Sequence, residues 1–328
     1  MSIVNQHFRT LLSATYRKAS SCPRRFRRSP HSSAGYASRP LRSVGVARAL
    51  QDSSTTPTPT LWTHEFSLAD RVALVSGGHG GLGLDAALAL VEAGARAVYC
   101  ADLPSEPDAR WTKVHDYASR LKGTGGEARL EYVSADVRDQ EGMIKLGEMI
   151  GSREGRLDIG IAAAGILPDP AHCLDIRGED FQAVMATNVA GALFTAQAAG
   201  RQMRRFGLGG SIILIASIAG REAFQGHPIA HYHTSKAAVL QMTRSLACEL
   251  ASESIRVSSI SPGFMHTNFI KPYLDVRPEY AEEWGRLNPL GRLGTGHDLR
   301  GAVVWLASDA SSFCTGNDIV VDGGHTAW

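Results

Sequence analysis

Residues 71–83 read RVALVSGGHGGLG, an apolar run that leads directly into a cluster of glycines. The run predicts a buried strand, and the apolar spacing of residues 85–94 (DAALALVEAG) predicts a helix just after it. Glycines between a strand and a helix permit a tight turn and let the backbone approach a pyrophosphate, whose charge the free N–H groups of the helix N-terminus stabilise. Glycine clusters also occur in ordinary turns, so it is this placement that favours a nucleotide site. The loop residues expected to contact the nucleotide are Ser76, Gly77, His79, Gly81, Leu82 and Gly83.

The alternation of strand and helix patterns continues to the end of the chain. Short apolar runs alternate with segments whose apolar residues recur every three or four positions, which predicts a parallel sheet with helices on both faces. Residues 62–328 contain no internal repeat and no visible boundary, so we expect one α/β domain there. The predicted strands are 71–76, 97–102, 130–136, 157–165, 210–217, 255–261 and 318–324, and the predicted helices are 85–94, 111–123, 179–205, 234–253 and 297–310.

Asp102 ends the second predicted strand, about 20 residues after the glycines, where a carboxylate can accept hydrogen bonds from both ribose hydroxyls of an adenosine. Such a carboxylate repels a 2′-phosphate, and the following LPSE contains no arginine to bind one, so the sequence favours NAD over NADP. His79 is only weakly basic and does not change this preference. A surface aspartate that caps the next segment is the alternative. Asp136, at the end of the third predicted strand, could contact the adenine amine or cap the following helix.

Tyr232 and Lys236 lie in HYHTSKAAV, residues 231–239, and a spacing of four places them on one face of a helix. An unperturbed tyrosine has a pKa of about 10 and is a poor base at neutral pH. A neighbouring ammonium and a positively charged nicotinamide favour the phenolate and would lower that pKa. This spacing is frequent by chance and is weak evidence for a catalytic pair when taken alone. Two further residues strengthen the prediction: Ser217, which ends the fifth predicted strand, and Asn188 in the preceding long helix. Taken singly, Ser217 could cap a turn and Asn188 could satisfy a helix break.

The glycine loop, Asp102, Ser217, the Tyr232–Lys236 pair and SPGFMHT (261–267) follow one another in this order. In this pattern residues 62–328 resemble the classical short-chain dehydrogenase/reductase family. The resemblance implies a single Rossmann-type doubly wound domain with a seven-stranded parallel sheet flanked by helices, and a homotetramer or homodimer. One departure is Ala163, where the family usually has an asparagine that ties neighbouring strands together, so local rigidity is more in question than catalysis.

The resemblance also implies a role for each of four residues. Tyr232 would be the general acid–base, and Ser217 would donate a hydrogen bond to the substrate oxygen. Lys236 would bind the nicotinamide ribose and lower the tyrosine pKa, while Asn188 would hold a water in the proton relay. The further cofactor contacts expected, in addition to Tyr232 and Lys236, are Asp136, Val137, Ala164, Gly165, Pro262, Gly263 and Thr267.

The expected reaction interconverts a secondary alcohol and a ketone, with hydride transfer to or from NAD. The C-terminal half, including TGNDIVVDGGHTAW (315–328), is similar to fungal polyol and ketose members of the family such as D-arabinitol 2-dehydrogenase and sorbose reductase. We therefore expect a small-molecule substrate, a sugar alcohol such as D-arabinitol. The residues expected to contact it are Ser217, Gln225, His231 and Tyr232.

Two rival functions remain open at this stage. A mitochondrial 3-oxoacyl thioester reductase would share the four catalytic residues, but it usually uses NADPH, and Asp102 argues against that cofactor. A cofactor-binding regulator without turnover would not need all four residues. His227, His231 and His233 could be imagined as metal ligands, but His231 and His233 flank a predicted helix start and would point to different faces, so no metal is expected.

The first 51 residues differ sharply in charge from the rest. They hold ten Lys or Arg and no acidic residue, which leaves 24 basic and 32 acidic residues elsewhere, a net charge of −8. A segment rich in Arg and Ser, free of acids and with an amphipathic opening, is typical of a mitochondrial transit peptide, and a disordered basic tail is the alternative. We expect residues 1–51 to be a targeting segment, 52–61 (including TTPTPT) a linker, and the mitochondrial matrix to be the location, with the cytoplasm as alternative.

The remaining composition limits the classes of function. The five cysteines are odd in number and scattered, which argues against a disulfide framework and a zinc knuckle. No run of about 18 uncharged apolar residues predicts a membrane span. The basic residues are concentrated in the predicted targeting segment, so they give no reason to expect a nucleic-acid partner.

Overall fold

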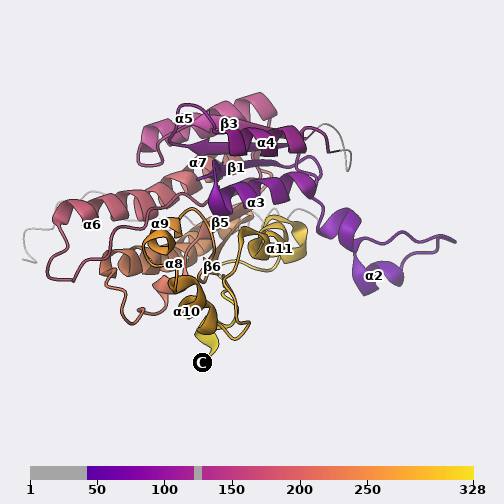
Figure 1. The fold of residues 1–328 in the computed structure, drawn as a ribbon. Coiled ribbons are helices and arrows are strands. Elements are labelled where there is room, and N and C mark those ends of the chain that lie inside the picture. Colours follow the sequence, from indigo (N-terminus) through magenta and orange to yellow (C-terminus); the bar gives the residue numbers. More distant parts are fainter. Residues whose placement is uncertain (1–42, 122–127) are drawn as a thin grey trace, which may run out of the picture. The chain divides into compact units, whose positions relative to one another are not determined.

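In the computed structural model, which describes residues 43–121 and 128–328, seven parallel strands form one sheet in the order β3-β2-β1-β4-β5-β6-β7 (Figure 1). The described residues belong to the second of two units into which the chain divides, Ser38–Trp328. Both the number of strands and their parallel direction confirm the sequence prediction. The strands are β1 (Val72–Ser76), β2 (Ala97–Asp102), β3 (Arg129–Ser134), β4 (Ile159–Ala162), β5 (Gly210–Ile215), β6 (Ile255–Pro262) and β7 (Asp318–Val321).

Helices cover both faces of this sheet because its strands are apolar on both sides. In β1, Ala73 and Val75 point to the core under α3, α4 and α11, whereas Val72 and Leu74 point to the core under α5, α7 and α8. Figure 1 shows α3 beside α11 on the first of these faces. The helices are α3 (Gly81–Glu92), α4 (Ala109–Ala118), α5 (Gln140–Glu154), α6 (Gly178–Met185), α7 (Gly191–Phe206), α8 (Ala230–Leu250), α9 (Lys271–Val276), α10 (Tyr280–Arg286) and α11 (Gly296–Ala307).

Two helical segments between β3 and β5 differ from the prediction. Helix α5 lies outside the predicted helices; its N-terminus is capped by Asp139, and it ends at Gly155 in the left-handed conformation. The long helix predicted over 179–205 is interrupted by a five-residue π-helix, η2 (Ala186–Ala190), between α6 and α7. Such π-turns are frequent at functional sites, and this one contains Asn188.

The strand order reverses between the neighbouring strands β1 and β4. The chain continues from β1 to α3 on one face of the sheet, whereas after β4 it leads to α7 on the opposite face. A doubly wound sheet binds its ligand in the crevice that this divergence leaves outside the carboxyl ends of the strands. Gly77 follows β1, Gly165 comes shortly after β4, and Ser217 comes shortly after β5. The fold therefore brings the predicted site residues to one edge of the sheet.

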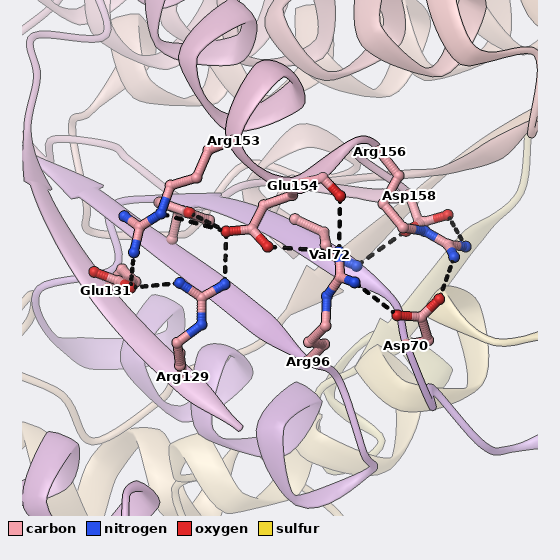
Figure 2. A network of polar contacts seen from close by, with 10 residues as sticks. Asp70, Val72, Arg96, Arg129, Glu131, Arg153, Glu154, Arg156 and Asp158 are labelled. Atoms are coloured by element: carbon pink, nitrogen blue, oxygen red, sulfur yellow. Dashed lines mark hydrogen bonds and ion pairs between the residues drawn. The ribbon is translucent and has the colours of Figure 1, made fainter. Parts of the chain in front are cut away.

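The opposite edge of the sheet is held by a network of charged side chains (Figure 2). Asp158, which is 1% exposed, accepts a hydrogen bond from the Val72 amide at 2.9 Å and pairs with Arg156. Glu154, which is 5% exposed, accepts hydrogen bonds from the Tyr99 hydroxyl and from Arg129, both at 2.6 Å. These contacts link the starts of the four strands β1, β2, β3 and β4 to the C-terminus of α5. They lie away from the edge of the sheet at which the predicted site residues meet.

Ahead of β1 the structure describes two short helical elements, α2 (Gly45–Ala49) and the π-helix η1 (Leu61–Glu65). Most of the targeting segment predicted for residues 1–51 lies outside the described residues. Within residues 43–121 and 128–328, no helix combines the length and the apolar character needed to cross a membrane.

Candidate active site

The glycine loop after β1 leaves the N-terminus of α3 open. Helix α3 begins at Gly81, receives no side-chain cap, and has no acidic residue in its first turn. Gly81 has a φ of +51°, and a Cβ built there would meet open space, whereas a Cβ on Gly83 would come within 2.1 Å of the Gly77 carbonyl oxygen. The third glycine thus permits the close packing of loop and helix, and the first turn offers its N–H groups to an anion. These features fit the pyrophosphate of a dinucleotide.

Asp102 lies where the sequence places it, at the end of β2 and in the wall of the same cavity. Its carboxylate accepts hydrogen bonds from the amides of His79 at 3.1 Å and Leu103 at 2.8 Å. The His79 ring nitrogen Nε2 accepts in turn from the Asp108 amide at 3.1 Å. His79 therefore holds the loop after β2 against the glycine loop and keeps the Asp102 carboxylate beside it.

Asp136, the second carboxylate at this end, is paired within the chain. Arg138 donates to both of its oxygens, at 2.7 to 3.0 Å, and this hydrogen bonding holds the pKa of Asp136 below its ordinary value. Arg138 also lines the cavity, and the sequence analysis missed it. Because its charge is balanced by Asp136, Arg138 does not by itself provide a free cation for a 2′-phosphate.

Tyr232 and Lys236 lie one turn apart near the start of α8, and both are buried. Burial raises the pKa of Tyr232 to about 12, while the hydrogen bond with Ser217 acts in the opposite direction. Burial lowers the pKa of Lys236 to about 8. In the chain without cofactor, loss of water around the phenol therefore outweighs the other effects on the pKa of Tyr232. The expected lowering by Lys236 together with a bound nicotinamide stays a prediction.

Asn188 organises the centre of the site from the π-helix η2. Its amide oxygen accepts from the Ile166 amide at 2.8 Å, and its amide nitrogen donates to the Ile166 carbonyl at 3.0 Å and to Ser235 at 3.1 Å. The Ser235 hydroxyl donates to the Tyr232 carbonyl at 2.8 Å. Asn188 therefore ties the segment after β4 to the helix that carries Tyr232, and its side chain is fully engaged in doing so.

A cavity of about 630 Å³ joins the glycine loop to the Tyr232 region. A single space of this size can hold a dinucleotide end and a small molecule beside it. The predicted site residues in its wall are Gly77, His79, Gly81, Leu82, Gly83, Asp102, Asp136, Val137, Ala164, Gly165, Ser217, Tyr232, Lys236, Pro262, Gly263 and Thr267.

Comparison with known proteins agrees with this geometry. Residues 77–326 match the protein family described as Enoyl-(Acyl carrier protein) reductase. A sorbose reductase of Schizosaccharomyces pombe is 37% identical over 267 residues, which cover 80% of this chain and 98% of that protein. The chain belongs to the short-chain dehydrogenase/reductase family. Membership makes it an NAD(P)-dependent oxidoreductase that acts on a CH–OH group of a small molecule.

Other members of the short-chain dehydrogenase/reductase family extend the comparison. A D-arabinitol 2-dehydrogenase of Scheffersomyces stipitis is 32% identical and covers 80% of this chain and 96% of its own length. An NADP-dependent mannitol dehydrogenase of Hypocrea jecorina is also 32% identical, over 82% of this chain and 97% of that protein. A crystal structure of a short-chain type dehydrogenase/reductase from Mycobacterium marinum has a TM-score of 0.73 at 38% identity, covering 80% of this chain and 98% of its own. These relatives differ in substrate by name, and of them only the mannitol dehydrogenase names a cofactor, so they fix neither substrate nor cofactor for this chain.

Four predicted residues lie outside the cavity wall. Ser76 accepts a hydrogen bond from Thr195 within the core. Asn188 does not line the cavity itself but is hydrogen-bonded to Ile166, which does. The expectation that Gln225 and His231 contact the substrate needs correction, because neither lines the cavity. Gln225 is exposed on the loop before α8, and His231 is buried beside Asp180 on the α6 side of the helix.

The structure adds residues at the substrate end that sequence reasoning did not select. His227 lines the cavity although its neighbours Gln225 and Gly226 do not, and Tyr273 and Trp284 reach it from α9 and α10. The sequence signal for Tyr273 and Trp284 is the stretch over residues 269–287, whose aromatic residues recur in a short amphipathic segment. Only the packing of that stretch reveals which side chains face the cavity.

Proposed function

We propose that the chain is an NAD-dependent dehydrogenase that interconverts a sugar alcohol such as D-arabinitol and its ketose. The observation that carries this proposal is the single cavity that runs from the glycine loop and Asp102 to Ser217, Tyr232 and Lys236. A nucleotide-binding end and a proton-transfer end in one space are what hydride transfer to or from a CH–OH group requires.

Within this site each residue has a distinct task. Tyr232 accepts the hydroxyl proton in oxidation and returns it in reduction, and the Ser217 hydroxyl holds the reacting oxygen. Lys236, buried one turn further along α8, binds the ribose next to the nicotinamide, and its charge favours the phenolate. When bound, the nicotinamide supplies the carbon that accepts or donates hydride. Because the Asn188 side chain is engaged with Ile166 and Ser235, the relay water is held by its main-chain carbonyl.

The preference for NAD rests on Asp102. Its carboxylate lies beside the glycine loop, where it can accept bonds from ribose hydroxyls and repel a 2′-phosphate. Arg138, the nearest lining arginine, is paired with Asp136. The NADP-dependent mannitol dehydrogenase at 32% identity is the argument on the other side, and a direct measurement decides between the two cofactors.

A neutral hydroxylated substrate is supported by the wall of the cavity beyond Tyr232. Among the described residues that line the cavity, the only Lys or Arg side chains are Arg138 and Lys236, both assigned above to the cofactor end. An acidic sugar or a thioester on an acidic carrier would bind better to a site with an unpaired Lys or Arg side chain at the substrate end. The sorbose reductase and the D-arabinitol 2-dehydrogenase among the relatives act on uncharged sugars by name.

Initial rates with the full chain test the proposal. NAD and NADP are each combined with D-arabinitol, xylitol, sorbitol, mannitol and a 3-hydroxyacyl thioester. We expect the highest kcat/KM with NAD and D-arabinitol. Activity with NADP and the thioester alone would favour the rival thioester reductase, and absence of turnover with every pair, together with tight NADH binding, would favour the non-catalytic regulator.

We further propose that residues 1–51 direct the chain to the mitochondrial matrix and that the enzyme is a homotetramer or homodimer. Import into isolated mitochondria, compared between the full chain and a chain that begins at residue 52, tests the first statement. Light scattering on the purified full chain tests the second. A monomer, or import that does not depend on the basic segment, would contradict them.

A further inference from the structure

His227 and Trp284 form a hydrogen-bonded pair at the substrate end of the cavity, and both lie in its wall. The indole Nε1 donates to Nε2 of the imidazole at 3.3 Å. Because an indole N–H can only donate, Nε2 must accept, so the neutral imidazole carries its hydrogen on Nδ1. The pair therefore fixes the tautomer of His227 and leaves an N–H donor on the other side of the ring.

The surroundings keep this imidazole uncharged. Its ring is half-buried and lies 5.6 Å from the rings of both Tyr280 and Trp284. Burial lowers the pKa of His227 and the nearby charge of Arg277 lowers it further, whereas Glu283 acts in the opposite direction. Protonation at Nε2 would also turn two N–H donors toward each other, which the Trp284 side chain opposes.

Two other polar side chains of this wall, those of Tyr273 and Trp284, already have partners. The Tyr273 hydroxyl donates to the Pro168 carbonyl at 2.6 Å, and the Trp284 N–H is used by His227. Phe224, Ile229 and Leu167 supply apolar surface beside Tyr232. A hydroxylated molecule held against Tyr232 thus finds a neutral donor in the imidazole of His227.

We propose that His227 is a specificity-determining residue whose Nδ1–H donates a hydrogen bond to a hydroxyl of an uncharged polyol or ketose, in the tautomer that Trp284 fixes. This inference rests on the proposed function and deepens it. A hydroxyl oxygen needs only one neutral donor, whereas a carboxylate is bound best by a cation. The pair therefore selects uncharged sugar alcohols against sugar acids such as gluconate.

Steady-state rates on the full chain with its cofactor test the proposal. The substrates are the polyol that the wild type uses best, a simple secondary alcohol without further hydroxyls such as 2-butanol, and gluconate. His227→Leu removes the donor, and His227→Asn keeps an amide N–H near the position of Nδ1. His233→Leu is the matched control, because His233 is half-buried and packs against the Phe224 ring at 5.1 Å but does not line the cavity.

We expect His227→Leu to raise KM for the polyol about tenfold, with a smaller effect on kcat, and to leave the kinetics of 2-butanol within about twofold. His227→Asn should recover most of the loss, and His233→Leu should behave as the wild type. Trp284→Phe removes the hydrogen bond that fixes the tautomer of His227, so that the imidazole can take up a proton at about pH 6 and bind a carboxylate. This variant should therefore raise the kcat/KM of gluconate relative to that of the polyol at this pH. Unfolding curves and NADH binding establish that each variant is folded.

Two results would overturn the inference while the proposed function stands. In one, His227→Leu changes KM for the polyol and for 2-butanol by the same factor. In the other, His233→Leu has the same effect as His227→Leu. A wild type that oxidises 2-butanol but no polyol would instead overturn the proposed function, and this inference with it.

Discussion

The Nζ atom of Lys236 lies 5.7 Å from the centroid of the Tyr232 ring and donates a hydrogen bond to the Ile215 carbonyl at 2.9 Å. Both side chains are buried, so each ionised form is costly in the chain without cofactor. The pKa of Lys236 is lowered to about 8 by burial, and that of Tyr232 is raised to about 12. The Tyr232–Lys236 pair therefore makes the stability of the protein depend on pH.

Lys236→Met removes the buried ammonium and should change that dependence. Between about pH 8 and pH 10 the unfolded chain keeps the lysine proton while the folded chain releases it, so the stability of the wild type rises with pH. We expect the wild type to gain on the order of 2 kcal/mol relative to the variant over this window. Urea unfolding at several pH values measures the difference. A difference that stays constant with pH would show that Lys236 keeps its ordinary pKa.

Asp102→Ala should change the choice of cofactor. Removal of the carboxylate abolishes an acceptor for the ribose hydroxyls and a charge that repels a 2′-phosphate. We expect kcat/KM with NAD to fall about tenfold and that with NADP to rise. Glu106→Gln is the control, because this carboxylate is exposed on the loop after β2 and does not line the cavity. A wild type that prefers NADP would contradict the assignment of Asp102.

Tyr273→Phe should loosen the substrate end. Its hydroxyl joins α9 to the segment after β4 through the Pro168 carbonyl, and its ring lines the cavity. Loss of this bond leaves the wall less organised before binding, so KM for the substrate should rise several-fold and kcat should change less. Tyr280→Phe removes a hydroxyl that bonds Arg277 outside the wall and serves as the control. Equal effects of the two variants would mean that the bond to Pro168 has no particular role.

Glu154→Gln should weaken the network at the far edge of the sheet (Figure 2) without changing catalysis. Burial opposes the charge of Glu154, but hydrogen bonds from Tyr99 and Arg129 outweigh it and hold the pKa below its ordinary value. Its arginine partners are partly exposed, so we expect a loss of about 2 kcal/mol, less than for a fully buried pair. The difference from the wild type should shrink as the pH falls below about 4, because the unfolded chain then binds a proton at this carboxylate more readily than the folded chain does.

Urea unfolding measures that loss, and Glu141→Gln is the matched control. Glu141 forms an exposed pair with Lys145 within α5, which contributes little to stability. If Glu154→Gln were as stable as Glu141→Gln, the network would contribute no measurable free energy to the stability of the fold. If it lowered kcat at temperatures where it stays folded, the far edge would be coupled to the site.

The strands and most helices could be predicted because their apolar periodicity is strong and their order is simple. Helix α5 was not predicted because glycines interrupt the apolar periodicity of its sequence. A Cβ on Gly147 would come within 2.5 Å of the Ala198 carbonyl oxygen, and one on Gly151 within 2.5 Å of Gln202, so these glycines permit close packing on α7. Gly77, Asp102 and Ser217 were predicted from their place at strand ends, and Tyr232 and Lys236 from their spacing of four on a helix.

The substrate end was not predictable to the same degree. Its residues come from the loop before α8 and from α9 and α10, and periodicity does not say which side of such segments faces a cavity. His231 was chosen for its position beside Tyr232, yet it does not line the cavity, and His227 takes the place in the wall. Likewise the pKa of Tyr232 depends on burial, which the spacing to Lys236 does not reveal.

The central claim is that Tyr232 transfers the proton in an NAD-linked oxidation of a sugar alcohol. The measurement that tests it most directly is kcat/KM with NAD and D-arabinitol for the wild type and for Tyr232→Phe, with NADH binding measured on both. We predict turnover by the wild type, a loss of about a thousandfold in the variant, and similar affinity for NADH. Equal rates in the two proteins would contradict the account.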